Sequence, residues 1–392
     1  MDIGDPVVAV DKIMEEIGIE KYLKTEPVHK MGRPGYNRVN MLKTILFGFM
    51  DTGDASEDKE DEEKSSSEKR KEESNEDGEN LMKKLSTYYS LVLFFAFLTN
   101  SKVSSLDDIL KAIGSSVENK RIAKNVGLDK DVLLTIRTII NPYVLSELDY
   151  KVAHMNHMSH DDSMPASDRV DRAMKKFGRL STSEIVTPAW VADKMVGYLP
   201  ADRIKHGTKI LDIASKQGEF ANALYKAFGD KIKDTVYSLP TSSLTYEFTR
   251  KVYTLLGLPV KNVIKDYISY DLLNDKTKEK IMNEFISLGT DIRIGNPPYQ
   301  DDAVGEQKTY NGPIYNLYLD CASSISDVVE MIHPTRFLSN AGSTPKTWNK
   351  KMLEDRHIGI CEFWNKSVRL FDENEIKGEV AISIRDKKVV YR

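Results

Sequence analysis

The chain has 392 residues, 40% of them apolar, and a net charge of −4, so it can fill the cores of two or more domains. Its two cysteines exclude a disulfide framework and a four-cysteine zinc site, as is usual in a reducing cytoplasm. No stretch reaches the ~20 apolar residues that span a bilayer, and the N-terminus lacks the pattern of a secretory signal. We therefore expect a cytoplasmic protein without a membrane partner.

Residues 1–53 contain short helical patterns, of which the clearest places apolar side chains on one face of a helix over residues 40–50. The stretch MGRPGYNRVNMLKTILFGFMDTG resembles the N-terminal domain of insertion-sequence transposases. No acidic catalytic core of that family follows it. We interpret residues 1–53 as a transposase-like remnant, and the alternative is a working DNA-binding arm.

Residues 54–80 have dense charge and no apolar periodicity, so we expect a disordered acidic linker. An acidic segment that mimics DNA is the less favoured alternative. Residues 51–80 contain 14 acidic and 5 basic side chains, a local charge of −9. Subtracting it from −4 leaves +5 for the rest of the chain, which is compatible with contacts to phosphate groups.

Residues 81–180 have the pattern of a helical domain, in which Ser105 is a plausible helix N-cap. His154, His157 and His160 recur every third residue, a spacing that on a helix suits a metal. Their segment is polar and ends in proline, so we predict a surface loop and no metal site. Asp107 and Asp108 bear a weak resemblance to the acidic residues of a nuclease site.

From residue 181 to residue 392 the pattern changes to alternating strands and helices. Four short apolar runs (KILDI, TVYSL, RIGNPP and VVEMIHP) end in small or polar residues, and helical patterns separate them. This alternation predicts an α/β fold with a mostly parallel sheet covered by helices. Such sheets bind ligands at the carboxyl ends of their strands, where the motifs of this chain fall.

The most specific motif is Asn296-Pro297-Pro298-Tyr299, which chance would produce in about one chain in a thousand of this length. It suits methylation of the exocyclic amine of adenine, whose lone pair is delocalised into the ring. The Asn296 side-chain oxygen and the Pro297 carbonyl can each accept one N–H and localise that lone pair for attack on a methyl sulfonium. The prolines fix the backbone, and Tyr299 offers a face for an extruded base.

A second motif, ILDIASKQGEF over residues 210–220, predicts a strand, a loop containing Gly218 and a helix. The first βα turn of a Rossmann-like sheet has this form. Before it, Thr187-Pro188 begins a helical pattern, and after it Tyr270-Asp271-Leu272 follows another apolar stretch.

This order of motifs is similar to one class of adenine methyltransferases, and residues 81–392 resemble the methylase region of type IIG (Eco57I-like) restriction-modification enzymes. The resemblance implies a Rossmann-like domain that uses S-adenosylmethionine on double-stranded DNA. The matching positions imply a catalytic tetrapeptide at Asn296–Tyr299. The positions that it implies for cofactor binding are Thr187, Pro188, Asp212, Ala214, Lys216, Gly218, Phe220 and Asp271.

The chain departs from the family at several motifs. Ser238-Leu239-Pro240 replaces an acidic residue that commonly holds the cofactor ribose. His333 begins a segment that in the family is usually Thr-Pro-Ala-Arg-Phe, and Lys377-Gly378-Glu379 replaces a double glycine. The sequence stops at Arg392, where the family normally continues into a region that reads DNA. A separate specificity subunit or a downstream chain is therefore an expected partner.

Two alternatives remain open at this point. The chain could be a truncated remnant that binds DNA or cofactor without turnover. It could also be a protein-glutamine methyltransferase, because an amide nitrogen poses the same chemical problem. Such enzymes lack the Thr-Pro segment and have a glycine-dense cofactor loop, so the adenine interpretation is favoured.

Overall fold

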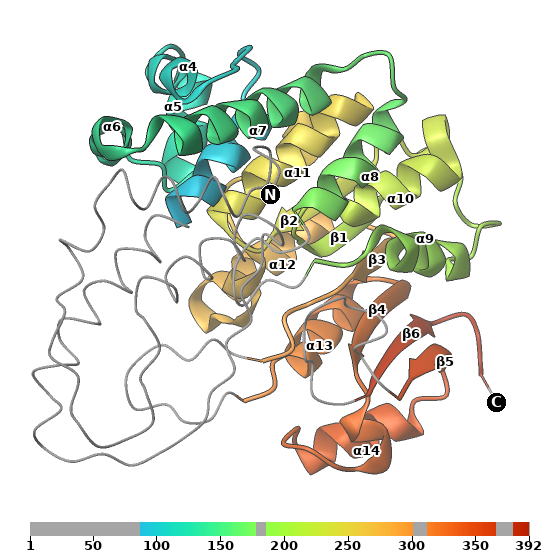
Figure 1. Cartoon of the computed structure of the whole chain (residues 1–392). Coiled ribbons are helices and arrows are strands. Elements are labelled where there is room, and N and C mark those ends of the chain that lie inside the picture. Colours follow the sequence, from blue (N-terminus) through green and yellow to red (C-terminus); the bar gives the residue numbers. More distant parts are fainter. Residues whose placement is uncertain (1–86, 178–185, 301–311, 366–378, 392) are drawn as a thin grey trace, which may run out of the picture. The chain divides into compact units, whose positions relative to one another are not determined.

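The computed structural model describes residues 87–177, 186–300, 312–365 and 379–391 (Figure 1). They divide into two compact units, one with residues 87–90 and 131–151 and one with residues 91–130 and 152–391. The transposase-like remnant, the acidic linker and the predicted domain boundary at residue 180 lie outside the described residues.

The first unit contains most of α6 (Lys130–Ile139) and the first half of α7 (Pro142–His160). The helical pattern of this stretch is confirmed, and Pro142 marks the start of the second helix, because its ring fixes φ and removes a donor that a first turn does not use. Lys151 lies 3.2 Å from Glu147 one turn away, and its ammonium lies over the ring of Tyr89.

The second unit begins with a helical stretch over residues 91–98, which is followed by α4 (Leu106–Ala112) and α5 (Val117–Val126). Ser105 caps α4 as predicted, because its side chain accepts a hydrogen bond from the Asp108 backbone N–H at 3.1 Å. Asp107 and Asp108 therefore occupy the first turn of a helix, where acidic side chains offset the helix dipole. This position accounts for both residues without a nuclease site.

The prediction of a surface loop around the three histidines is wrong. His154, His157 and His160 lie in the last turns of α7, which continues to His160. The inner face of these turns is buried, and Asn156 there bonds the Ala96 carbonyl and the Val103 N–H, at 2.9 and 3.2 Å. These tertiary contacts outweigh the polar composition. Within the described residues no group of His, Cys, Asp and Glu is placed to hold a metal.

The strands of the described residues form one six-stranded sheet with the order β2-β1-β3-β4-β6-β5. Their bounds are β1 Ile210–Ser215, β2 Val236–Pro240, β3 Ile292–Gly295, β4 Val328–Pro334, β5 Ile358–Trp364 and β6 Val380–Asp386. The four strands predicted from the sequence are confirmed and run parallel, whereas β6 pairs antiparallel with both β4 and β5. The fold is the expected α/β, Rossmann-like sheet.

Alternate residues of each central strand face opposite helical layers. In β4, Val328 and Ile332 belong to one apolar cluster, and Val329 and Met331 belong to the other. Both faces of the sheet are therefore covered, which explains why the strands appear in the sequence as nearly continuous apolar runs.

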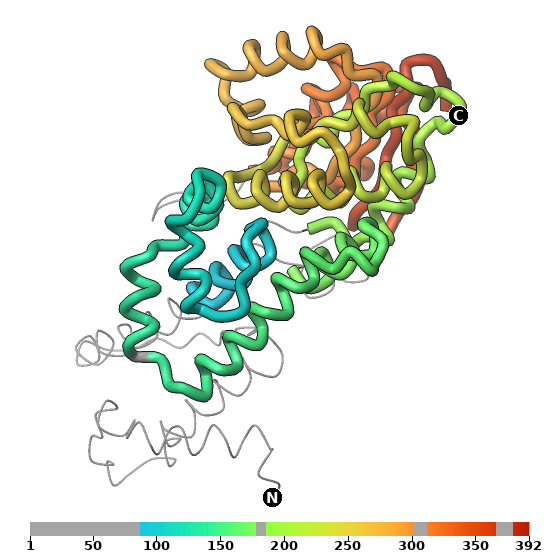
Figure 2. The backbone as a smooth tube through the Cα atoms, turned by 90° about the horizontal axis from the view of Figure 1, so that it is seen from above, coloured from blue at the N-terminus to red at the C-terminus, as the bar shows by residue number. Residues whose placement is uncertain are grey.

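One layer of helices covers each face of the sheet (Figure 1). One layer consists of α8 (Ala166–Lys176), α9 (Ala189–Tyr198), α10 (Glu219–Phe228) and α11 (Ser243–Leu256). The other consists of α12 (Asp275–Leu288), α13 (Tyr315–Ile325) and α14 (Lys346–Glu354). Figure 2 shows, from above, α12 in gold on the opposite side of the strands from α8 in green. Among the described residues, no helix combines the length and the apolar character needed to cross a membrane.

The helical segment of the second unit is attached to α11. Phe94 and Phe97 contact the rings of Phe177 and Phe248, with centroids 5.3–6.0 Å apart. Beside them, Arg121 of α5 donates two hydrogen bonds to the buried Glu247 carboxylate, at 2.9 and 3.1 Å. A bidentate pair of this kind combines strength with a fixed direction, so it aligns the two elements.

One carboxyl group is buried in the middle of the sheet. Glu330 of β4 is fully buried, and neither of its oxygens has a hydrogen-bond partner in the described residues. It faces the same layer as Val328 and Ile332. Burial without a partner disfavours the charged form and raises the pKa of Glu330 well above its ordinary value of 4.5.

Replacing Glu330 by glutamine should therefore reduce the loss of stability with rising pH. The folded state holds a proton on Glu330 that the unfolded chain releases above about pH 4.5. The contribution of this proton to the free energy of unfolding is therefore fully present at low pH and is lost as the pH rises. Thermal melts of both proteins from pH 5 to pH 8 should show a Tm difference that grows in favour of Glu330→Gln. Each 1 kcal/mol corresponds to roughly 2–4 °C. His333, whose buried ring has a lowered pKa of about 4, is common to both proteins and cancels. A constant Tm difference across this range would contradict the prediction.

Candidate active site

The strand order reverses between β1 and β3. From β1 the chain moves outward to β2, and a parallel bridge from Ser238 to Val263 adds a third position at that edge. It then returns to the other side of β1 as β3. Connections that leave in opposite directions open a crevice at the carboxyl ends of the two strands, which is where doubly wound folds bind ligands. The β1 loop and the Asn296 tetrapeptide both begin there.

The β1 loop depends on Gly218, which is the N-cap of α10 and has φ +76°. A β-carbon at this position would lie 3.0 Å from Cγ1 of Val252 on α11. Glycine is thus required both by the left-handed backbone and by the close approach of α11. Directly after it, Phe220 is fully buried in the core and anchors the first turn of α10.

The loop contains two buried carboxylates that are incompletely bonded. Asp212 accepts from the Ala214 N–H at 3.2 Å and Glu219 from the Gln217 N–H at 2.8 Å. Asp212 Oδ2 and Glu219 Oε1 have no donor within the described residues, and the Ser215 hydroxyl is 3.1 Å from Thr249. Burial first, and the charge of Glu219 second, raise the pKa of Asp212 well above its ordinary range. The crevice therefore offers acceptors to a ligand with N–H groups.

Lys216 brings a positive charge into the same loop. Its side chain is 3% exposed, and its ammonium donates to the Asn296 backbone carbonyl at 2.9 Å. This contact spans the crevice from the end of β1 to the end of β3. Lys216 thus joins the predicted cofactor loop to the predicted catalytic motif.

Asn296 is held from two elements. It is 3% exposed, its Nδ2 donates to Thr187 Oγ1 at 3.2 Å, and its carbonyl accepts from Lys216. Thr187 is fully buried and precedes Pro188, the N-cap of α9. The Thr187-Pro188 helix start, with its buried face on α9, is confirmed. The structure therefore brings together Thr187, Lys216 and Asn296, which are far apart in the sequence.

The prolines and Tyr299 continue the chain away from β3. Pro297 is buried, and Pro298 and Tyr299 are partly exposed. Tyr299 packs against both apolar clusters, and burial raises the pKa of its hydroxyl, which has no partner within the described residues. The ring thus lies at the point where the two layers meet, with part of its surface open.

Ala214 joins this contact network through its backbone N–H, which donates to Asp212, whereas Asp271 makes its contacts elsewhere. Ala214 is buried in the second core layer. Asp271 is on the 3-10 helix η4 (Ser269–Leu273), which packs against α12 and α13, and its carboxylate accepts from the Ile268 N–H at 2.9 Å.

Two residues of the β1 loop, Gln217 and Glu219, were not selected from the sequence. Gln217 is 2% exposed and donates to the Phe177 carbonyl, and Glu219 is 1% exposed. The sequence did contain a signal for them, because they are polar residues on either side of the loop glycine, at the end of a strand that the fold buries.

Two of the segments that depart from the resembled pattern, those of His333 and Glu379, lie side by side at the end of β4. His333 is buried, stacks on Tyr315 with centroids 6.0 Å apart and pairs with the Ser383 hydroxyl at 2.6 Å. Thr335 donates from its hydroxyl to the Glu379 carboxylate and from its N–H to the Glu379 carbonyl, both at 3.1 Å. The Glu379 carboxylate is thereby tied to the carboxyl edge of the sheet.

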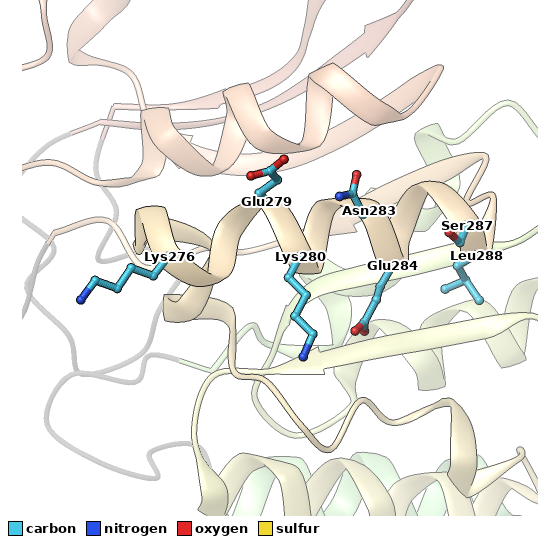
Figure 3. Close-up of a pocket in the computed structure, with 7 residues that line it drawn as sticks. All are labelled: Lys276, Glu279, Lys280, Asn283, Glu284, Ser287 and Leu288. Carbon is cyan, nitrogen blue, oxygen red and sulfur yellow. The ribbon is translucent and has the colours of Figure 1, made fainter.

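A surface hollow on α12 is unrelated to this crevice (Figure 3). All seven residues that line it lie between Lys276 and Leu288. None of them is a predicted site residue, and they belong to one exposed helix face. The crevice at β1 and β3 is therefore the candidate active site.

Comparison with known proteins shows a similarity to one family over part of the chain. Residues 224–371 match the Eco57I restriction-modification methylase family. This range contains the Asn296 tetrapeptide and begins after the β1 loop. A comparison with curated protein sequences gave no significant match.

Several solved structures are similar to this one at low sequence identity. A DrdV–DNA complex shares 15% identity over 77% of this chain and 36% of that chain, with a TM-score of 0.49. The type I restriction-modification methyltransferase subunit from Streptococcus thermophilus shares 15% over 77% and 79%, with a TM-score of 0.45. The type IIG restriction endonuclease BpuSI shares 14% over 78% and 37%, with a TM-score of 0.41. The chain thus spans little more than a third of the DrdV and BpuSI chains.

Substituting Gly218 by alanine should destabilise the fold more than the same change at Gly207. Both glycines have positive φ, +76° and +91°, but only Gly218 has a neighbour within 4 Å of the added β-carbon. Backbone strain alone costs about 1 kcal/mol, and the contact with Val252 adds to it. Denaturant unfolding of Gly218→Ala, Gly207→Ala and Gly218→Ala with Val252→Ala measures the two parts. The double variant should recover the steric part only, and equal costs at both glycines would show that the approach of α11 is unimportant.

Proposed function

We propose that this chain transfers a methyl group from S-adenosylmethionine to the N6 amine of adenine in double-stranded DNA, as the methylase part of a restriction-modification system. The observation that carries the proposal is the placement of Asn296. It ends β3 at the switch point of the sheet, is nearly buried, and is bonded to both Thr187 and the β1 loop. The family match over residues 224–371 supports the methylase part.

The polar groups of the crevice fit the proposed cofactor. The methionine part of S-adenosylmethionine has an ammonium group, for which Asp212 Oδ2 and Glu219 Oε1 are buried acceptors that have no donor among the described residues. It also has a carboxylate, for which the Lys216 ammonium is a suitable partner. When bound, the cofactor supplies a methyl group on a positively charged sulfur.

The residues of the chain then act on the target amine. Asn296 Oδ1 and the Pro297 carbonyl accept its two N–H groups, which favours a pyramidal nitrogen and localises its lone pair. The Pro297-Pro298 backbone is stiff, so these acceptors stay in place during the reaction. The partly exposed ring of Tyr299 gives an extruded base a surface on which to stack. No strong base is needed, because the nitrogen loses its proton after it has gained the methyl group.

Tritium transfer from labelled S-adenosylmethionine, together with a titration of cofactor binding, tests this function against its alternatives. Incorporation into N6-methyladenine of a mixed-sequence DNA duplex is the expected result. Incorporation into added protein acceptors and not into DNA would favour methylation of glutamine. Cofactor or DNA binding without transfer would identify a binding remnant.

Asn296→Ala should abolish methyl transfer and leave the Kd for the cofactor nearly unchanged. Asn296 contacts the target amine in the proposed mechanism, and loss of one preorganised polar contact to the reacting group lowers the rate roughly 100- to 1,000-fold. Asn283→Ala, on the exposed face of α12 in Figure 3, is the matched control and should keep full activity. Turnover of Asn296→Ala above about a third of the wild-type value would rule out the catalytic role.

A further inference from the structure

The hydrogen bond between Thr187 and Asn296 joins residues 109 positions apart in the chain. Both side chains are buried, at 0% and 3% exposure, so water does not compete for this contact. Thr187 Oγ1 accepts from Asn296 Nδ2 at 3.2 Å. A single hydrogen bond between two buried side chains has a large influence on their orientation. A buried polar group that is left without a partner costs its full desolvation penalty.

The orientation of the Asn296 amide decides whether the target amine meets an acceptor or a donor. An asparagine side chain has an oxygen at one end and an NH₂ group at the other, and rotation by half a turn exchanges them. Only the oxygen can accept an N–H from adenine. With Nδ2 engaged by Thr187, Oδ1 is the end that remains for the crevice.

Thr187 is held in a fixed position by the helix start that follows it. Pro188 follows directly and is the N-cap of α9, with φ −55°. The first turns of α9 are fixed in the core by Val191, Ala192 and Met195, each fully buried. The hydroxyl thus projects from a rigid helix start and not from a surface loop.

The backbone of Asn296 is fixed independently. The Lys216 ammonium holds its carbonyl at 2.9 Å, so the peptide plane between Asn296 and Pro297 has its own anchor. Rotation of the side-chain amide is then the remaining freedom of this residue, and Thr187 is the group that restricts it.

We propose that Thr187 is a positioning residue for Asn296: its hydroxyl holds Nδ2 and presents Oδ1 to the amine that is methylated. The inference rests on the proposed function and extends it, because the family resemblance implied only that Thr187 lies against the cofactor. The prediction is that Thr187 acts on kcat through Asn296 and has little effect on the cofactor Kd.

Three variants separate this role from a structural one. Thr187→Val keeps the shape of the side chain and removes the hydroxyl, and Thr187→Ser keeps the hydroxyl. Thr290→Val is the matched control, since Thr290 is also buried but bonds Arg293 at the opposite end of β3. Displacement of one reacting contact lowers rates by roughly 10- to 100-fold, which is the expected loss of kcat for Thr187→Val. Thr187→Ser should recover most of it, Thr290→Val should lose none, and the cofactor Kd of every variant should stay within about threefold of wild type.

A second measurement does not require turnover. With ¹⁵N-labelled asparagine, the side-chain NH₂ signals of Asn296 are identified by their loss in Asn296→Ala. In the full-length protein they should move and exchange faster with solvent in Thr187→Val, and they should keep their positions in Thr187→Ser and Thr290→Val. Unchanged NH₂ signals in Thr187→Val would overturn the inference, as would a tenfold loss of cofactor affinity with normal kcat. If wild type transfers no methyl group, the proposed function fails, and the NH₂ signals still decide whether Thr187 orients Asn296.

Discussion

The parallel pairing of β1 with β3 is the constraint on which the rest of the site depends. Asp212 lies opposite Ile294, so the two strands end at nearly the same level and release their loops side by side. The pairing is close, since a β-carbon on Gly295 would lie 3.0 Å from Ile213 Cγ2. A shift of one residue would turn every side chain of β3 to the other face and would move Asn296 out of the crevice. The helices on both sides are what keep this register unique.

The crevice concentrates polar groups in a fold that is otherwise apolar. Four of these groups are buried: Asp212, Lys216, Glu219 and Asn296. Within the described part of the chain, some of their acceptors have no donor. Such groups cost stability unless a ligand completes their bonds. Glu330 imposes a similar cost two strands from Asp212, since Ile294 pairs with both residues in the sheet. The stability cost of these buried polar groups therefore falls on residues that lie side by side across β1, β3 and β4.

The sequence was sufficient for the central strands, and the candidate site that it indicated at their carboxyl ends stays a prediction. The apolar runs at β1 to β4 are nearly continuous because both faces are buried, and Asn296-Pro297-Pro298-Tyr299 follows one of them. The antiparallel strands β5 and β6 were not predicted. Residues of β5 such as Glu362 are partly exposed at the sheet edge, which weakens the apolar pattern. Helix α7 was missed at His154–His160 because its buried face is polar.

The contacts within the site were not visible in the sequence for a different reason. Thr187 and Lys216 reach Asn296 across 109 and 80 residues, and no periodicity reports on such distances. The resemblance selected all three residues but gave no relation among them. Only the packing of α9 on the sheet and the turn at Gly218 bring their polar atoms together.

The aromatic cluster that attaches the helical segment to α11 has a consequence for biosynthesis. Phe94 and Phe97 precede Phe248, the ring against which both pack, by about 150 positions. Ribosomes add roughly 5–20 residues per second, so these rings wait about 10–30 s for that partner to be made. Their apolar surface is open to chaperones and to other nascent chains during this interval. The N-terminal helices of the second unit are thus translated early and completed late, when α11 emerges.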